Sequence, residues 1–449
     1  MMGEAIERLK ALREMPDVFD IPEEVLRPLH IAATQEALDA QRPHIPVLDK
    51  RARDMGIDRV RSLDDVVPLL FAHSNYKSYP ASFLAQGRWK ALLQWLAMVS
   101  TPDYSDVDVE GIADIDDLLQ RLWAAGYCVT TSSGTGGKLS MVPKSTGDMN
   151  RLKDFILHFR EMERPLPPER QFHFFCFGPV LGTYTATSIN AFTIEGFARP
   201  DSTYVLIEEP MRNVAIMRMA EMRRRMADGT ATPDEIAQME AQAAAQSEQM
   251  KERFASMADK FLELRHERVW LSAMTAQLWD LMLLARERGI ERAELGPGSV
   301  ITGGGGRKHL NLPDDFQEQL NDFYGTRGPA GYGMSEMSWL YPACGAGRYH
   351  VHPFAAALIL DERGERLLAR EGVVEGRFAF MDPTTDYRWG GLISGDKVTA
   401  DFGSCPCGRK GMTILDPIRR YADINADGDK IECAGTIDAY IRGGFAQTA

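Results

Sequence analysis

Between about residue 170 and residue 415, short apolar runs alternate with helical segments and glycine turns, which limits the fold more than any other feature. The runs FHFFCFGPV (172–180) and STYVLIEE (202–209) have the length and residue types of buried strands. The stretch GSVITGGGG (298–306) predicts a strand that enters a glycine turn. Strands that alternate with helices favour an α/β layered domain, with its chemistry on loops at strand ends.

Helical periodicity marks the N-terminal part of the chain and one later segment. Residues 21–41 and 88–100 carry apolar side chains at helical spacing, and the proline-marked segment 64–80 between them is predicted to be extended. Thr232 and Glu235 predict a capping box, and the alanine, glutamine and methionine stripe behind it indicates core packing or helix pairing. We expect a mainly helical region over 1–120, a core over 121–415 with a helical insertion at about 210–260, and a short remnant over 416–449.

Composition excludes several classes of protein. The 449 residues carry a formal net charge of −13, which argues against a nucleic-acid partner. No stretch approaches the ~20 apolar residues of a membrane span, and the first residues lack a signal-peptide run, so we expect a cytoplasmic protein. Six cysteines are few for a disulfide scaffold of this length, which favours reduced thiols or a metal site.

A loop rich in hydroxyl residues and glycine occupies CVTTSSGTGGKLSMVPKS (128–145). Its glycines can present backbone N–H groups, and Lys138 adds a positive charge, a combination that suits a polyphosphate. A Walker loop requires glycine at 132 and Ser or Thr at 139, where this chain has serine and leucine, so that interpretation fails. A stretch of this kind taken alone is more often an ordinary loop.

The order of later motifs resembles the adenylate-forming enzyme superfamily, which includes acyl-CoA synthetases, luciferases and adenylation domains. SSGTGGK (132–138) matches its phosphate loop, and GYGMSEMS (331–338), LISGDKV (392–398) and PIRRYAD (417–423) follow in the family's order. The resemblance implies an α/β fold with a large adenylate-forming domain, ATP and Mg²⁺. It assigns Mg²⁺ to Glu336, ribose to Asp396, ribose or phosphate to Arg420, adenine to Tyr332, and further nucleotide contacts to Ser132, Ser133, Gly134, Thr135, Gly136, Gly137, Gly304, Gly333 and Ser335.

Other stretches look like the acyl-protein synthetases of bacterial bioluminescence, and phenylacetate-CoA ligases share much of the same core. The similarity covers roughly residues 65–435. Most members of the superfamily add a C-terminal domain of about a hundred residues, whereas only 29 residues follow Arg420, so we expect that domain to be truncated or absent. Phosphate neutralisation then falls to Lys138, with Lys144 and Arg307 in reserve, and Lys430 is a candidate remnant.

Cysteine and histidine residues form a second constellation. Cys405 and Cys407 lie in a Cys-x-Cys turn, and Cys344 and His350 lie about sixty residues before it. Three thiolates and one imidazole suit a structural Zn²⁺ site, and some phenylacetate-CoA ligase relatives carry zinc at matching positions. Free cysteines in a glycine turn are the alternative. His350 matches those relatives better than His352 does.

Together these features predict an AMP-forming ligase that condenses a carboxylic acid with ATP, releases pyrophosphate, and passes the acyl group to a thiol or amine. A carrier or partner protein is one candidate for that acceptor. Cys433, near the C-terminus, resembles the acylated cysteine of the bioluminescence synthetases, but a cysteine without a role is an equal alternative. His173 and Trp339 are guesses for the acid pocket. The rivals are an ADP-releasing ATPase or kinase, and a binding protein on a degenerate adenylation fold.

Overall fold

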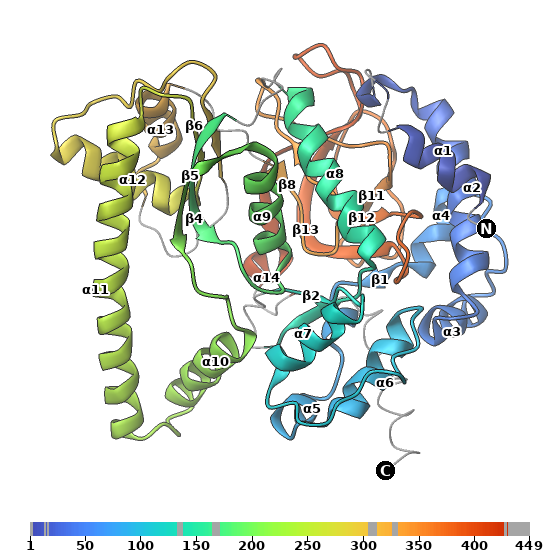
Figure 1. Cartoon of the computed structure of the whole chain (residues 1–449). Coiled ribbons are helices and arrows are strands. Elements are labelled where there is room, and N and C mark those ends of the chain that lie inside the picture. The colour runs from blue at the N-terminus through green and yellow to red at the C-terminus, as the bar shows by residue number, and fades with distance from the viewer. Residues whose placement is uncertain are drawn as a thin grey trace. The chain divides into compact units, whose positions relative to one another are not determined.

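The computed structural model describes residues 3–12, 15, 18–132, 138–163, 171–303, 312–325, 331–425 and 429. The chain forms two compact units, and Figure 1 labels their helices and strands. The first unit contains residues 1–131, 140–150 and 336–449, and the second contains 132–139 and 151–335. Each unit combines a sheet with helices, so the predicted α/β class is confirmed.

The N-terminal part of the first unit is helical, as predicted. Its helices are α1 (Glu4–Ala11), α2 (Glu23–Gln41), α3 (Pro46–Asp54), α4 (Leu63–Val66), α5 (Ala81–Ala85), α6 (Trp89–Val99) and α7 (Ile115–Ala124). The expectation of an extended segment at 64–80 is wrong for most of its length, because α4 and two 3₁₀ turns (Val67–Leu69 and Asn75–Lys77) occupy it. Ser62 and Asp65 form a capping box that starts α4, and proline fits the first turn that follows.

An antiparallel sheet forms the body of the first unit. Its strand order is β10-β14-β13-β12-β11, and β1 pairs in parallel with β13. The strands β11 and β12 carry mostly buried residues, including Phe378 and Phe380, which pack as aromatic neighbours. The bounds of the strands are β1 (Phe71–Ala72), β10 (Tyr349–His350), β11 (Ala356–Leu360), β12 (Val373–Met381), β13 (Gly391–Asp401) and β14 (Thr413–Arg420).

A parallel sheet in the order β5-β4-β6-β7 forms the body of the second unit. Successive residues of β4 point to opposite faces, so Phe174 packs beside Trp270 while Phe175 packs beside Phe261 of α11. Both faces are therefore buried, as the continuous apolar runs predict. The bounds are β4 (Phe172–Pro179), β5 (Ala198–Ile207), β6 (Val269–Ser272), β7 (Val300–Thr302), α9 (Thr185–Phe197), α12 (Thr275–Glu287) and α13 (Phe316–Tyr324).

Two further helices, α10 (Asn213–Ala227) and α11 (Pro233–Leu264), fill the segment that the sequence marks as helical. The capping box predicted at Thr232 is present, because Thr232 and Glu235 exchange side-chain to backbone hydrogen bonds. The remaining elements are β2 (Thr130–Ser132), β3 (Ser140–Val142), α8 (Thr146–Glu163), β8 (Gly331–Tyr332), β9 (Tyr341–Pro342) and α14 (Tyr421–Ile424).

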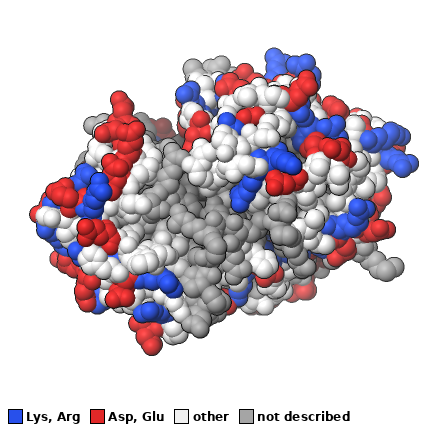
Figure 2. All heavy atoms as spheres, turned by 90° about the horizontal axis from the view of Figure 1, so that it is seen from above, with Lys and Arg blue, Asp and Glu red and all other residues white. Residues whose placement is uncertain are grey.

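The surface seen in Figure 2 mixes acidic and basic side chains, and no extended basic area is visible among its described residues. That agrees with the acidic balance of the whole sequence, although it describes one face only. None of the described helices is both long enough and apolar enough to span a bilayer.

Candidate active site and metal centre

Glu336 lies in a buried cluster of charged side chains within the first unit. The residues Glu336, Lys144 and Arg388 are respectively 8%, 1% and 1% exposed, and Arg388 donates from Nη2 to the backbone oxygen of Glu336. Burial raises the pKa of the Glu336 carboxyl, and the positive charges of Arg388 and Lys144 oppose that rise. The carboxyl group is therefore buried, and the charges of Arg388 and Lys144 favour its ionised form.

Lys144 lies two residues before helix α8, next to Ser145, which is hydrogen-bonded to the first turn of that helix. Ser145 accepts a hydrogen bond from the Asp148 backbone at 2.8 Å, and Asp148 accepts one from the Ser145 backbone at 2.8 Å. Burial and the nearby Arg388 lower the pKa of Lys144 to about 7. The positive charge of Lys144 acts on the Glu336 carboxyl, and its reserve role in phosphate neutralisation stays a prediction.

Asp396 and Arg420 meet across two neighbouring strands. They are direct partners in the antiparallel register of β13 and β14, and Arg420 Nε lies 3.6 Å from Asp396 Oδ1. The Asp396 side chain is 13% exposed and that of Arg420 is 60% exposed, so the pair reaches from the sheet toward solvent. The negative charge of Asp396 also contributes to the raised pKa of Glu336, so these two predicted residues act on one another electrostatically.

His73 lies beside the same part of β13. Its backbone N–H donates to Ile393 at 2.9 Å, and a Cβ on Gly395 would lie 3.4 Å from the His73 ring and 3.0 Å from Asp429. Glycine at 395 therefore lets the imidazole and the carboxylate approach the strand closely. Burial, reinforced by Lys77, lowers the pKa of His73 to about 4. Its buried Nδ1 atom has no hydrogen-bond partner within the described part of the chain.

Other predicted nucleotide contacts belong to the second unit, and several lie outside the described residues. Ser132 and Lys138 flank residues 133–137, and Tyr332 in β8 is buried. Thr185 donates a hydrogen bond to the backbone oxygen of Ser335 at 3.4 Å. Gly333 is half-buried nearby in the chain. The predicted residues outside the described ranges are Ser133, Gly134, Thr135, Gly136, Gly137, Gly304, Arg307, Lys430 and Cys433.

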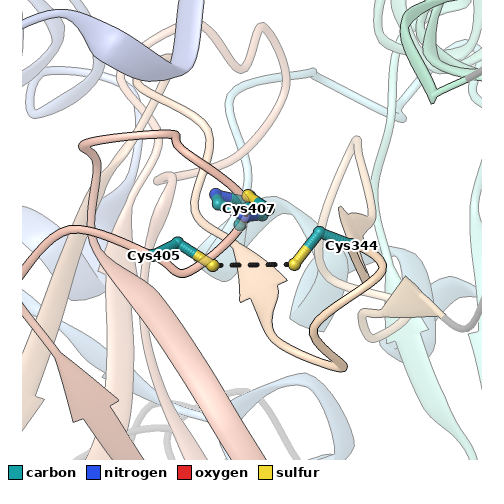
Figure 3. Close-up of side chains that lie close together, drawn as sticks. Cys344, Cys405 and Cys407 are labelled. Carbon is teal, nitrogen blue, oxygen red and sulfur yellow. Dashed lines mark hydrogen bonds between the residues drawn. The ribbon is translucent and has the colours of Figure 1, made fainter.

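The structure brings together Cys344, Cys405 and Cys407, which Figure 3 shows. His350 joins them, and the ligand atoms of all four residues lie within 4.8 Å of one another. Cys344 Sγ and Cys405 Sγ are 3.6 Å apart, and Cys407 Sγ lies 3.3 Å from His350 Nε2. In a tetrahedral zinc site with Zn–S bonds of about 2.3 Å, neighbouring sulfur atoms lie about 3.8 Å apart. These spacings fit that geometry, and three thiols with one imidazole are a usual zinc donor set.

Two similar turns present the thiols. The backbone N–H of Cys344 donates to Arg348 at 2.9 Å, and that of Cys405 donates to Arg409 at 2.8 Å. His350 comes from β10, and burial lowers its pKa to about 4, which keeps the imidazole neutral as a metal ligand requires. His352 lies apart from this set, because its Nε2 is hydrogen-bonded with Leu340 at 3.0 Å.

The guessed pocket residues each have contacts inside their own unit. His173 Nδ1 lies 2.5 Å from Ser202 Oγ, and Trp339 packs edge-on against Phe380. The sequence reasoning did not single out Arg388 or His73. Nothing in the residues around Arg388 marks it as buried, since arginine in a polar stretch is usually exposed.

Comparison with known proteins shows a shared fold at low sequence identity. No protein-family model matches the chain, and no curated protein sequence matches it significantly. A structure of 2-hydroxyisobutyryl-CoA ligase in the postadenylation state with R3-HIB-AMP aligns with a TM-score of 0.56 at 12% identity, covering 90% of this chain and 69% of the ligase. An open form with 2-HIB-AMP and CoA gives 0.56 at 13% identity, covering 90% and 77%. The chain thus has the fold of an adenylate-forming enzyme, as its motifs predict.

Proposed function

We propose that this protein is an AMP-forming ligase that activates a carboxylic acid. A carboxylate oxygen attacks the α-phosphorus of ATP, the bond to pyrophosphate breaks, and an acyl-adenylate forms. A thiol or amine then attacks the acyl carbon, and AMP leaves. The observation that carries the proposal is the opposition of Asp396 and Arg420 across β13 and β14, in the electrostatic neighbourhood of Glu336. The fold shared with 2-hydroxyisobutyryl-CoA ligase supports it.

Each side chain has a task that its chemistry permits. Asp396 can accept hydrogen bonds from ribose hydroxyls, and Arg420 can donate to ribose or phosphate oxygens. Glu336 is suited to Mg²⁺, because this ion is commonly held by one or two carboxylates together with substrate phosphates. When bound, Mg²⁺ would neutralise phosphate charge. Lys144 and Arg388 stabilise the ionised form of Glu336, which is the form that binds a cation.

The predicted phosphate contacts complete the nucleotide part of the proposal. We assign phosphate to Lys138 and to the loop Ser132, Ser133, Gly134, Thr135, Gly136 and Gly137, and further nucleotide contacts to Gly304, Tyr332, Gly333 and Ser335. Arg307 remains a reserve phosphate ligand. Backbone N–H groups in glycine loops bind phosphates without a side-chain charge, and the lysine adds that charge.

The acceptor in this proposal is a thiol or an amine. Coenzyme A, a carrier or partner protein and Cys433 are all thiol candidates, and an amine is the other class. Intact mass spectrometry under denaturing conditions, after incubation with ATP and acid, separates self-acylation from transfer. An adduct that disappears in Cys433→Ser assigns self-acylation. If the chain stays unmodified, coenzyme A or an amine is added, and AMP release together with the acylated acceptor identifies an external acceptor.

We also propose that Cys344, His350, Cys405 and Cys407 bind a structural Zn²⁺ ion. Four protein ligands leave no open coordination position, so this zinc would stabilise the fold rather than contact the substrate. The site requires reduced thiols, and we therefore place the protein in the cytoplasm, where thiols remain reduced.

Pyrophosphate exchange into ATP tests the adenylation step, with Mg²⁺ and a panel of fatty, aromatic and amino acids. We expect exchange that depends on one acid class and falls at least about 100-fold in Glu336→Gln. Arg420→Ala, at a largely exposed position, should raise the KM for ATP without loss of fold. Glu371→Gln, at an exposed acid of the same unit, is the matched control. Release of ADP in place of AMP would contradict the proposal.

A further inference from the structure

The turn that carries Cys405 and Cys407 contacts a segment of the N-terminal helical part. This segment is the 3₁₀ turn Val18–Asp20, which lies between α1 and α2 in the sequence. Its Val18 side chain is fully buried, and Phe19 is 6% exposed. Asp20 meets a residue that is 390 positions away, so this contact exists only in the folded unit.

Three contacts join this segment to the residues that follow Cys407. Asp20 Oδ1 accepts a hydrogen bond from the backbone N–H of Lys410 at 2.7 Å. The Arg409 guanidinium lies 4.7 Å from the centre of the Phe19 ring, within range of a cation–π interaction. Gly411 permits the close approach, because a Cβ there would lie 2.5 Å from the Phe19 backbone oxygen. A side chain at 411 would therefore push the two segments apart.

Phe19 also packs against the histidine of the cysteine cluster. The rings of Phe19 and His350 meet edge-on, with their centres 5.6 Å apart, and the ring centres of Phe19 and His352 are 4.8 Å apart. Both histidines are fully buried. His350 Nε2 is the atom that lies 3.3 Å from Cys407 Sγ. Phe19 therefore contacts the imidazole directly and the cysteine turn through Arg409.

We propose, on the basis of the zinc site proposed above, that Val18–Asp20 positions the metal ligands. It holds the His350 ring and the turn 405–411 in the arrangement that binds Zn²⁺. Replacing a residue that orients metal ligands typically lowers metal affinity roughly 10- to 100-fold. Because coupling between two equilibria is reciprocal, Zn²⁺ must favour the docked form of Val18–Asp20 by the same factor.

Removal of the metal should act on this segment more than on its neighbours. The ligand atoms lie within 4.8 Å of one another, and thiolates at such distances repel one another when no cation lies between them. The turn 405–411 should then loosen, and Phe19 and Asp20 would lose their partners. Helix α1 has a separate attachment, because Glu36 of α2 accepts hydrogen bonds from the backbone N–H groups of Ala5 and Ile6.

Competition for Zn²⁺ between the full chain and a chromogenic chelator tests the effect on metal affinity. We expect Phe19→Leu and Asp20→Ala each to weaken Zn²⁺ binding at least about tenfold. Asp20→Asn keeps an oxygen that can accept from Lys410, so it should bind Zn²⁺ as the wild type does. Phe83→Leu is the matched control, because Phe83 is 2% exposed and has Arg88 over its ring, but lies in α5. It should lower stability without changing Zn²⁺ affinity.

Limited digestion with chymotrypsin, which cleaves after phenylalanine, tests the reciprocal effect. Chelation of Zn²⁺ should speed cleavage after Phe19 at least about tenfold, the same factor as the loss of affinity, and leave cleavage after Phe83 unchanged. In Cys405→Ser/Cys407→Ser, cleavage after Phe19 should be fast with or without added Zn²⁺. Mass spectrometry of the fragments identifies each cleavage site.

The outcomes separate this proposal from those on which it does and does not depend. Wild-type Zn²⁺ affinity in both Phe19→Leu and Asp20→Ala would overturn it and leave the zinc site in place. Equal acceleration of cleavage after Phe19 and Phe83 would also overturn it, because the metal would then support the whole unit. A wild-type chain that binds no Zn²⁺ would overturn the zinc site and this proposal together, and pyrophosphate exchange would still test adenylation.

Discussion

Arg377 and Asp429 form a buried ion pair between residues 52 positions apart. Arg377 Nη2 lies 2.8 Å from Asp429 Oδ1, and Nη1 lies 3.2 Å from Oδ2, with side chains only 1% and 8% exposed. The guanidinium also donates to Ser394 and lies 4.0 Å from the centre of the Tyr421 ring. The pair therefore attaches the chain beyond β14 to the sheet of the first unit.

Removing one partner of this pair should destabilise the first unit strongly. Arg377→Met leaves the Asp429 carboxylate buried without its cation, at a cost of roughly 3–5 kcal/mol in the free energy of unfolding. Adding Asp429→Asn should recover part of the loss, because the stranded charge is removed. Urea unfolding measures both changes. Arg366→Ala, which breaks a pair whose arginine is 78% exposed, is the control and should cost less than about 1 kcal/mol.

Loss of the proposed zinc should be visible in metal content and in stability. Purified protein should contain about one zinc per chain, and the double variant Cys405→Ser/Cys407→Ser should contain none and melt at a lower temperature. Elemental analysis and calorimetry provide the two readouts. Cys176→Ala, at a buried cysteine of the second unit, should retain the metal. A metal-free wild-type protein with normal stability would rule the site out.

The free energy of unfolding should depend on pH through protonation of His73. Its pKa in the folded chain is about 4, below the ordinary value of about 6.5, so the unfolded state binds the proton first as the pH falls. The contribution of His73 is therefore fully present above pH 6.5 and is lost between about 6.5 and 4. The unfolding free energy of His73→Gln should decline less over that interval than the wild-type value. His44→Gln, at an exposed position, is the comparison.

The capping box should stabilise the first turn of α11. Thr232→Ala removes the hydroxyl that accepts from the Glu235 backbone, and we expect a loss of about 1 kcal/mol in local helix stability. Hydrogen exchange of residues 233–240 should become faster, while Thr232→Ser should behave as the wild type does. Equal exchange in all three proteins would mean that other contacts hold this end of the helix.

Local patterns in the sequence predicted many elements correctly, for identifiable reasons. The apolar run at 172–180 predicts β4 because both faces of a parallel strand are buried, and Thr232 with Glu235 predicts the start of α11 because the capping bonds are local. The segment 64–80 was misjudged because its prolines fit the first turns of short helices as well as an extended chain.

The cluster of three cysteines and His350 could be predicted only in part from the sequence. The spacing of Cys405 and Cys407 indicated a metal site, and a resemblance to known relatives selected Cys344 and His350 as the other two ligands. Only the folded chain brings these atoms within 4.8 Å of one another, because the turn at 405–409 and strand β10 meet through the sheet. The number of residues between two side chains does not give the distance between them in the folded chain.

Local residue patterns were sufficient to predict the α/β class, the main helices and strands, and the order of the motifs that suggest ATP chemistry. Which charges act on one another is known only from the folded chain. The charges of Arg388 and Lys144 act on Glu336, and Arg377 pairs with Asp429, although the sequence marks none of these interactions. Helix and strand periodicity reports on near neighbours in the chain, whereas burial and ion pairing depend on segments that meet only when the sheet closes around them.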